Sequence, residues 1–300
     1  MKKIKEFFNC NVFFATYGTT IKTLFRSILF WMAAVVVFCL IMHCAMKINR
    51  SYVVVEDGQI IETIYDTDPR YKLEYKTVIN VIFNLQAWLT TYALPVFAVI
   101  STLIIVLRNH ADGFFEIEKA SNVSTFSYLG GRLCALITVN TVMCLICAFA
   151  SFYYYYYSRG GMAGSTFINV VKYLNPRVLR QVFYDLMPGL IFYIVFTYAV
   201  GTIAKKGVVG GIVGMLYVLF NYLSCTTLRM KLPKVYHDFL SPFSDGIQGW
   251  WGHYNTEWFY EKSYHNPFTI NDMYLAYGII FGAILFYIAI SFILTKRRTR

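Results

Sequence analysis

The chain has 300 residues, of which 57% are hydrophobic and only 14% are charged, and its mean hydropathy is +0.50. Soluble proteins carry about 25% charged residues, so this chain has too few charges to cover a water-facing surface of its size. The composition excludes a soluble enzyme, a disordered chain and a disulfide-stapled secreted domain, and it predicts a polytopic membrane protein.

Residues 1–23 are predicted to form an amphipathic helix that lies along the inner membrane surface. Its apolar side chains recur at steps of three and four residues, and they are Phe7, Cys10, Phe14, Tyr17, Ile21 and Leu24. Polar side chains such as Lys5, Thr16 and Thr20 fall on the other side of the same helix. An apolar stripe of this kind favours the membrane interface. The helix is expected either to anchor the chain or to take a mechanical part, and the sequence leaves both open.

Six apolar stretches are long enough to cross a bilayer and are predicted to be transmembrane helices. They comprise residues 24–46, 78–107, 133–157, 186–204, 207–228 and 273–295. Only Lys205 and Lys206 separate the fourth stretch from the fifth, so these two are expected to form a tight helical hairpin. The predicted fold is an all-α polytopic membrane protein with an N-terminal amphipathic interfacial helix and long outer loops. Residues 24–300 would form one six-span transmembrane domain.

The positions of the lysines and arginines favour an orientation with both termini in the cytoplasm. The bases placed on that side are Lys2, Lys3, Lys5, Lys22, Arg26, Arg108, Lys119, Arg132, Lys205, Lys206, Lys296, Arg297, Arg298 and Arg300. They are concentrated in short inner segments, whereas the remaining bases are diluted over much longer outer loops. The net charge of +11 is therefore interpreted as a signal of topology in the cell (plasma) membrane, and nucleic acid is rejected as a partner.

Three long outer loops are predicted, over residues 47–77, 158–185 and 229–272. A short β-hairpin is expected in the first loop, with its turn at Asp57-Gly58. In the third loop, the side chains of His253, Glu257, Glu261 and His265 follow one another at intervals of four. On a helix they would form a polar stripe that is too long for one metal ion, so no metal is expected.

The predicted spans hold almost no ionisable residues at mid-depth, and the chain carries no catalytic motif. Ion-coupled and proton-coupled transporters generally need ionisable groups inside their spans. The sequence contains no H-E-x-x-H, no G-x-S-x-G and no G-x-x-x-x-G-K-[ST]. We therefore expect neither an enzyme nor a cofactor bound by this chain, which has no P-loop of its own for ATP.

Pairs of glycines four residues apart indicate close helix packing. They are Gly207 with Gly211, Gly210 with Gly214, and Gly278 with Gly282. Such small-xxx-small pairs allow two helix backbones to approach each other inside a membrane. The contact can be within one chain or between two chains, and the spacing alone does not distinguish these cases.

The inner loop, residues 108–132, carries the candidate binding site for a partner protein. Apolar side chains flanked by charges follow one another in the order Asp112, Gly113, Phe114, Phe115, Glu116, Ile117, Glu118 and Lys119. In a docking surface the apolar centre supplies affinity and the surrounding charges fix the register. The alternative interpretation is a hydrated loop that happens to carry two phenylalanines.

This loop resembles the coupling segment of ABC-2 type ABC transporter permeases. The matching residues are Asp112-Gly113, Glu116 and the run Tyr128-Leu129-Gly130-Gly131-Arg132. The family is also similar in its topology, with an inner amphipathic helix, six spans, a short inner turn between the fourth and fifth spans, and a long outer segment before the sixth. Residues 122–124 depart from the family, because a proline is usual there. The first outer loop is also larger than in compact members.

The resemblance implies that the chain is the transmembrane permease subunit of an ABC transporter. ATP and Mg²⁺ would bind a separate ATPase subunit, docked on Asp112, Gly113, Phe114, Phe115, Glu116, Glu118 and Lys119. A second permease chain, identical or different, would complete the pathway. The cargo would be amphipathic, lipid-like or peptide, and export is the usual direction. The alternative is a membrane sensor or scaffold that transports nothing and binds a ligand or partner through its aromatic outer loops.

Overall fold

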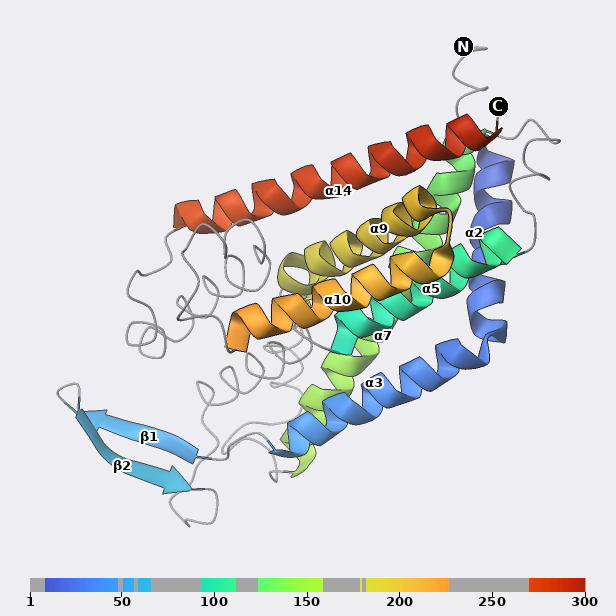
Figure 1. Cartoon of the computed structure of the whole chain (residues 1–300). Coiled ribbons are helices and arrows are strands. Elements are labelled where there is room, and N and C mark those ends of the chain that lie inside the picture. Colours follow the sequence, from blue (N-terminus) through green and yellow to red (C-terminus); the bar gives the residue numbers. More distant parts are fainter. Residues whose placement is uncertain are drawn as a thin grey trace.

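The computed structural model describes residues 9–47, 51–56, 59–65, 93–111, 124–158, 179, 182–226 and 270–299. They form seven α-helices, one β-hairpin and a short π-helical turn (Figure 1). The helices are α2 (Cys10–Arg26), α3 (Ile28–Lys47), α5 (Leu94–Ala111), α7 (Thr125–Ser158), α9 (Met187–Ala204), α10 (Gly207–Thr226) and α14 (Ile270–Thr299). The strands are β1 (Ser51–Glu56) and β2 (Gln59–Tyr65), and the π-helical turn is η2 (Val182–Leu186).

Three helices in the described part of the chain are long and apolar enough to cross a membrane. They comprise Thr125–Ser151 of α7, Met187–Ala204 of α9 and Tyr277–Lys296 of α14. A fourth candidate is the bent pair of α2 and α3, and the apolar parts of α5 and α10 are shorter. The protein is therefore a membrane-embedded helical protein.

The helices leave large apolar side chains on their outer surfaces, as expected where lipid replaces water. Trp31 on α3, Leu216 on α10 and Leu285 on α14 are 50%, 58% and 68% exposed, respectively. A water-soluble protein rarely leaves so many large apolar side chains uncovered. Hydrocarbon tails, in contrast, are as apolar as leucine and solvate such side chains without cost.

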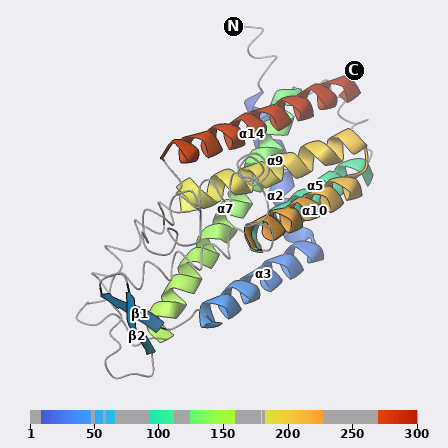
Figure 2. The same ribbon diagram turned by 60° about the vertical axis from the view of Figure 1, so that its left-hand side comes forward.

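Helix α9 lies at the centre of the bundle, and α5, α7, α10 and α14 pack around it. Figure 2 shows α9 running between α10 and α14, with α7 passing obliquely to all three. Aromatic rings pack between these helices. The ring centroid of Phe196 on α9 lies 5.3 Å from that of Tyr217 on α10 and 5.2 Å from that of Tyr287 on α14. Aromatic pairs at such distances add to the packing energy beyond the area that they bury.

The first two helices are separated by a sharp break at Ser27. Asn9 caps the start of α2, because its side-chain Oδ1 accepts hydrogen bonds from the N–H groups of Asn11 and Val12. At the other end the Ser27 N–H donates to the carbonyl of Leu24, and the axes of α2 and α3 differ in direction by 72°. Helix α2 thus extends to Arg26, beyond the predicted boundary at residue 23. The first apolar helix begins at Ile28 and not at Leu24.

The inner loop is shorter than predicted, because helices cover both of its ends. Helix α5 continues to Ala111, and α7 begins at Thr125, well before the predicted start of the third span at residue 133. Ser124 precedes the first turn of α7, and its carbonyl accepts the N–H of Tyr128. The prediction used the charge of Arg132 as the helix boundary, but capping groups and not apolarity determine where a helix begins.

The predicted β-hairpin in the first outer loop is confirmed. Strands β1 and β2 pair antiparallel from Ser51 opposite Tyr65 to Glu56 opposite Gln59, with an irregularity between Val54 and Val55. The predicted turn residues, Asp57 and Gly58, lie outside the described residues, as do residues 159–178 and 227–269 of the other two outer loops. The histidine and glutamate stripe of residues 253–265 is therefore also outside them.

Candidate functional site

Most of the basic residues in the described elements lie at one end of the helix bundle. The end is formed by the α2–α3 break, the end of α5, the start of α7, the α9–α10 turn and the end of α14 (Figure 1). We call it the basic end, and its bases are Lys22, Arg26, Arg108, Arg132, Lys205, Lys206 and Lys296. Away from this end lie Lys47, the last residue of α3, and the acidic residues of the described elements, which are Glu56 in β1, Glu62 in β2, Asp185 in η2 and Asp272 near the start of α14.

Helix α2 runs across the basic end and packs most closely on the first turns of α7. The N–H of Asn9 donates to Ser127 Oγ at 2.6 Å, which ties the start of one helix to the start of the other. A Cβ atom placed on Gly131 would lie 2.6 Å from the carbonyl oxygen of Phe13 and 3.1 Å from Thr16 Cβ. The α2 backbone therefore occupies the space where any other residue at position 131 would have its side chain.

The neighbouring glycine tolerates a side chain far better. A Cβ on Gly130 would lie 3.5 Å from the ring of Phe13, which is an ordinary van der Waals contact. The two adjacent glycines of the run that suggested a family resemblance thus differ in role. Only Gly131 is required by the close approach of another backbone.

The same run contributes a buried cation. Arg132 is only 6% exposed, and its guanidinium lies 4.1 Å from the ring centroid of Tyr128, one helical turn earlier. A guanidinium over an aromatic face is stabilised by the ring quadrupole, more strongly when water is excluded. Arg132 therefore holds its charge inside the contact between helices instead of on an open surface.

Helix α2 also contacts the end of α5. The Arg108 side chain donates a hydrogen bond from Nη1 to Thr23 Oγ1 at 3.3 Å. Helix α2 is thus attached to the last turns of α5 through Thr23 and to the first turns of α7 through Asn9. These two helices flank the segment that contains the predicted docking residues, Asp112, Gly113, Phe114, Phe115, Glu116, Glu118 and Lys119, all of which lie outside the described residues.

The α9–α10 turn at the basic end consists of two residues, Lys205 and Lys206, as the sequence predicts. Lys205 ends α9 in the left-handed conformation, with φ of 54°, and its N–H donates to the carbonyl of Thr202. Four glycines of α10 then lie against neighbouring helices. A Cβ atom on Gly207 would lie 2.9 Å from the nearest α5 atom, and one on Gly211 would lie 2.8 Å from its nearest α5 atom. Cβ atoms on Gly210 and Gly214 would each lie 2.7 Å from the nearest α9 atom.

The remaining pair of predicted packing residues behaves differently. Neither Gly278 nor Gly282 of α14 has a described atom within 4 Å of the position of its Cβ. The spacing of these glycines equals that of the α10 pairs, but their surroundings within the described chain do not. Their contact with a second chain stays a prediction.

Sequence reasoning missed two features of the basic end, namely the break at Ser27 and the bond from Arg108 to Thr23. A signal for the break exists, because the amphipathic pattern changes to a continuous apolar run directly after Arg26-Ser27 and serine is a favoured helix cap. The bond between helices leaves no comparable signal in the sequence. Among the described residues, no three side chains of histidine, cysteine, aspartate or glutamate lie close enough together to hold a metal ion. No known family model and no curated protein matches the chain.

Proposed function

We propose that this chain is the membrane-spanning permease subunit of an ABC-2 type ABC transporter and that it works with a separate ATPase. The observation that carries the proposal is the position of α2, which is attached to both helices that flank the 112–123 segment. A partner that moved this segment would displace α5, α7 and α2 together. A solvated loop without a partner would not require that α2 be bonded to the helices on both sides of it.

The proposal includes six spans, with both termini on the cytoplasmic side of the plasma membrane. Helices α3, α5, α7, α9, α10 and α14 would be the spans, and α2 would be the interfacial helix. The 72° bend before α3 supports this, because it turns α2 away from the direction of the first span. The collection of bases at the end where α2 lies supports the orientation, since cytoplasmic segments are enriched in lysine and arginine.

In the proposed mechanism, the ATPase binds the segment that contains Phe115 and Glu116, and ATP and Mg²⁺ stay on the ATPase. Closure of an ATPase pair would push the segments of two permease chains. Helix α7, with its 34 residues, would carry the displacement across the membrane as one rigid element. The contact of Gly131 with the α2 backbone would prevent α7 from sliding without α2.

The cargo we propose is an amphipathic or lipid-like molecule or a peptide, moved outward between two permease chains. Among the buried side chains of the described residues, Arg132 alone is charged, and it lies at the basic end. The described interior therefore offers no fixed charge at mid-depth for a small ion. Apolar and weakly polar cargo suits such walls best.

The experiment is a purification of the tagged chain from its native membrane, with identification of the proteins that accompany it. The wild-type chain is expected to retain a protein with a P-loop. Reversing two charges, Glu116→Lys with Glu118→Lys, is expected to release it. The matched control, Glu56→Lys with Glu62→Lys, changes the same charges in the hairpin at the opposite end and is expected to retain it.

Equal yield and equal thermal stability of the two double variants would show that both fold. If the wild-type chain carries no P-loop protein while other membrane complexes from the same preparation stay intact, the permease assignment fails. A membrane sensor or scaffold that uses its outer loops would then be the better account. If both double variants retain the ATPase, the docking site is elsewhere.

A further inference from the structure

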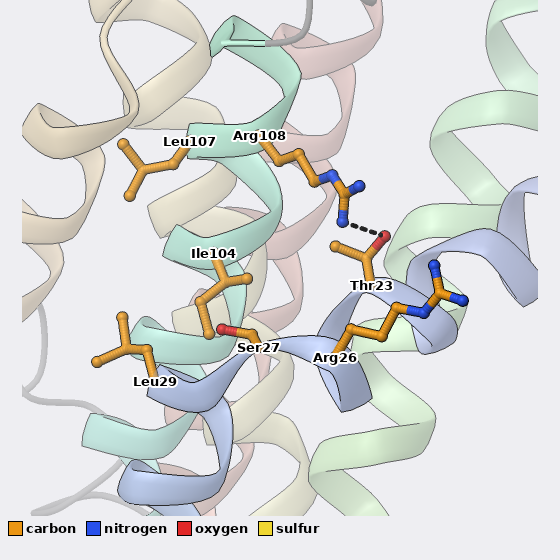
Figure 3. A pocket seen from close by; sticks show the side chains of 7 residues that line it. All are labelled: Thr23, Arg26, Ser27, Leu29, Ile104, Leu107 and Arg108. Carbon is orange, nitrogen blue, oxygen red and sulfur yellow. Dashed lines mark hydrogen bonds between the residues drawn. The ribbon is translucent and has the colours of Figure 1, made fainter.

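A cavity of about 430 Å³ lies in the angle between α2 and α3, where α5 passes close to the break (Figure 3). Its volume falls within the range of sites that bind small molecules, about 300–1,000 Å³. Three helices contribute to its wall: the last turn of α2, the first turn of α3 and the last turns of α5. The cavity is therefore bounded by the elements that meet at the basic end.

One side of the cavity is cationic and rich in hydrogen-bond donors. Arg26 and Arg108 line it, with the hydroxyl groups of Thr23 and Ser27. Figure 3 shows both arginine side chains extending to the same side of the break, with Thr23 between them. Thr23 Oγ1 accepts a hydrogen bond from Arg108 Nη1, which holds this guanidinium at the edge of the cavity.

Two arginines next to one cavity match the chemistry of a phosphate group. The guanidinium fork donates two parallel hydrogen bonds to phosphate oxygens, and its charge persists at all physiological pH values. The first turn of α3, which starts at Ile28, adds the positive end of a helix dipole on the same wall. The polar side thus favours an anion over a cation or a neutral group.

The other side of the cavity is apolar. Leu29, Ile104 and Leu107 line it, and Leu29 is 46% exposed. In Figure 3 these three side chains lie on the side of the break away from the two guanidinium groups. A free phosphate ion would fill only the cationic side. A molecule that joins a phosphate to a hydrocarbon chain would cover both sides.

We propose that this cavity binds an anionic phospholipid from the membrane leaflet at the basic end. The phosphate group would lie between Arg26 and Arg108, and the upper part of an acyl chain would lie along Leu29, Ile104 and Leu107. The lipid would join α2, α3 and α5, and so hold the bend at Ser27. The inference rests on the proposed membrane orientation of α2 and needs no ATPase.

The test measures binding of two lipids to the full chain purified in mild detergent, by native mass spectrometry and by thermal shift. Dioleoyl phosphatidylglycerol is expected to bind saturably and to raise the melting temperature. Dioleoyl phosphatidylcholine, whose phosphate is offset by choline, is expected to bind more weakly. Inorganic phosphate alone is expected to have no effect at the same concentration.

The decisive variant is Arg26→Gln with Arg108→Gln, which removes both guanidinium groups. It is expected to weaken phosphatidylglycerol binding by about tenfold or more, the factor that corresponds to losing charge-assisted hydrogen bonds. The matched control is Lys205→Gln with Lys206→Gln, which removes the same charge from the α9–α10 turn at the same end. This control is expected to bind phosphatidylglycerol as the wild-type chain does.

Three results would overturn the inference. They are equal binding of the two lipids, equal loss in the arginine and lysine double variants, and protection by inorganic phosphate as strong as that by phosphatidylglycerol. The last result would indicate a site for a free anion. The outcome for the proposed transporter function is independent of this test, because a chain without an ATPase could still bind the lipid through its arginines. If the wild-type chain retains an ATPase but shows no preference for phosphatidylglycerol, only the proposed lipid site is refuted.

Discussion

Substitution of Gly131 by alanine tests the contact between α2 and α7 most sharply, because the adjacent Gly130 supplies a matched control. Alanine at position 131 places a Cβ 2.6 Å from the carbonyl oxygen of Phe13, whereas alanine at position 130 meets only the Phe13 ring at 3.5 Å. Ordinary contacts between carbon and oxygen are about 3.3–3.6 Å. The two helices must therefore move apart by several tenths of an ångström or more in the first variant alone.

The cost follows from overpacking, which destabilises by about 1–3 kcal/mol where the neighbouring atoms cannot shift easily. The obstructing atom here belongs to a backbone, so relief requires displacement of the whole of α2. Alanine is favoured over glycine within a helix by about 1 kcal/mol, and this gain is common to both variants, which lie next to each other in α7. The difference between the variants isolates the contact.

We expect Gly131→Ala to unfold at a temperature about 2–12 °C below that of Gly130→Ala, at roughly 2–4 °C per kcal/mol. The measurement is thermal unfolding of both purified variants in the same detergent, followed by tryptophan fluorescence. Gly130→Ala should be as stable as the wild-type chain or more so. Equal melting temperatures for the two variants would refute the close packing of α2 on α7.

Two further predictions concern contacts between spans. Gly210→Ala should lower the yield of folded protein, because its Cβ would lie 2.7 Å from Gly201 Cα. Gly278→Ala should leave the yield of the isolated chain unchanged, because its Cβ would meet no described atom. The yields are measured by size-exclusion chromatography, and equal yields of the two variants would contradict this. Asn140 Nδ2 donates to Ser101 Oγ at 3.0 Å, so alanine substitutions of the two should show a coupling energy of about 0.6–1.7 kcal/mol in a double-mutant cycle. Strictly additive melting-temperature changes would argue against that bond.

Much of the fold follows from composition and apolar patterning. Apolar runs identify the helical stretches, and the Asp57-Gly58 pair identifies the hairpin. Positions of helix ends are less accessible, as the start of α7 illustrates. Arg132 looked like a boundary because it is charged, but it is buried over Tyr128 inside the helix. A charged residue can be buried in a contact between helices, so its position does not mark the end of a helix.

The faces of α2 show a second limit. Its apolar side chains recur at helical spacing, but Phe14 is 62% exposed while Thr16 and Thr20 are buried. The two threonine hydroxyls donate to the carbonyls of Val12 and Thr16, one turn earlier in the same helix, and so need no water. In a membrane protein, both the lipid and the protein core can surround apolar side chains and polar side chains whose hydrogen bonds are made within the helix. Amphipathicity alone therefore does not tell which face packs on other helices.

The glycines show a third limit, since identical spacing led to different surroundings. Gly210 lies against Gly201 of α9, while Gly278 meets no described neighbour. The difference depends on which helices become neighbours. That choice is a property of the whole fold and leaves no trace in the i, i+4 pattern.

The proposed working form of this chain is one of a pair of permease subunits driven by an ATPase. The most direct measurement is the mass of the intact complex purified in mild detergent, by native mass spectrometry. We expect a complex of two membrane chains with two copies of a protein that carries a P-loop. A species that contains this chain alone, or with a partner that has no P-loop, would contradict the claim.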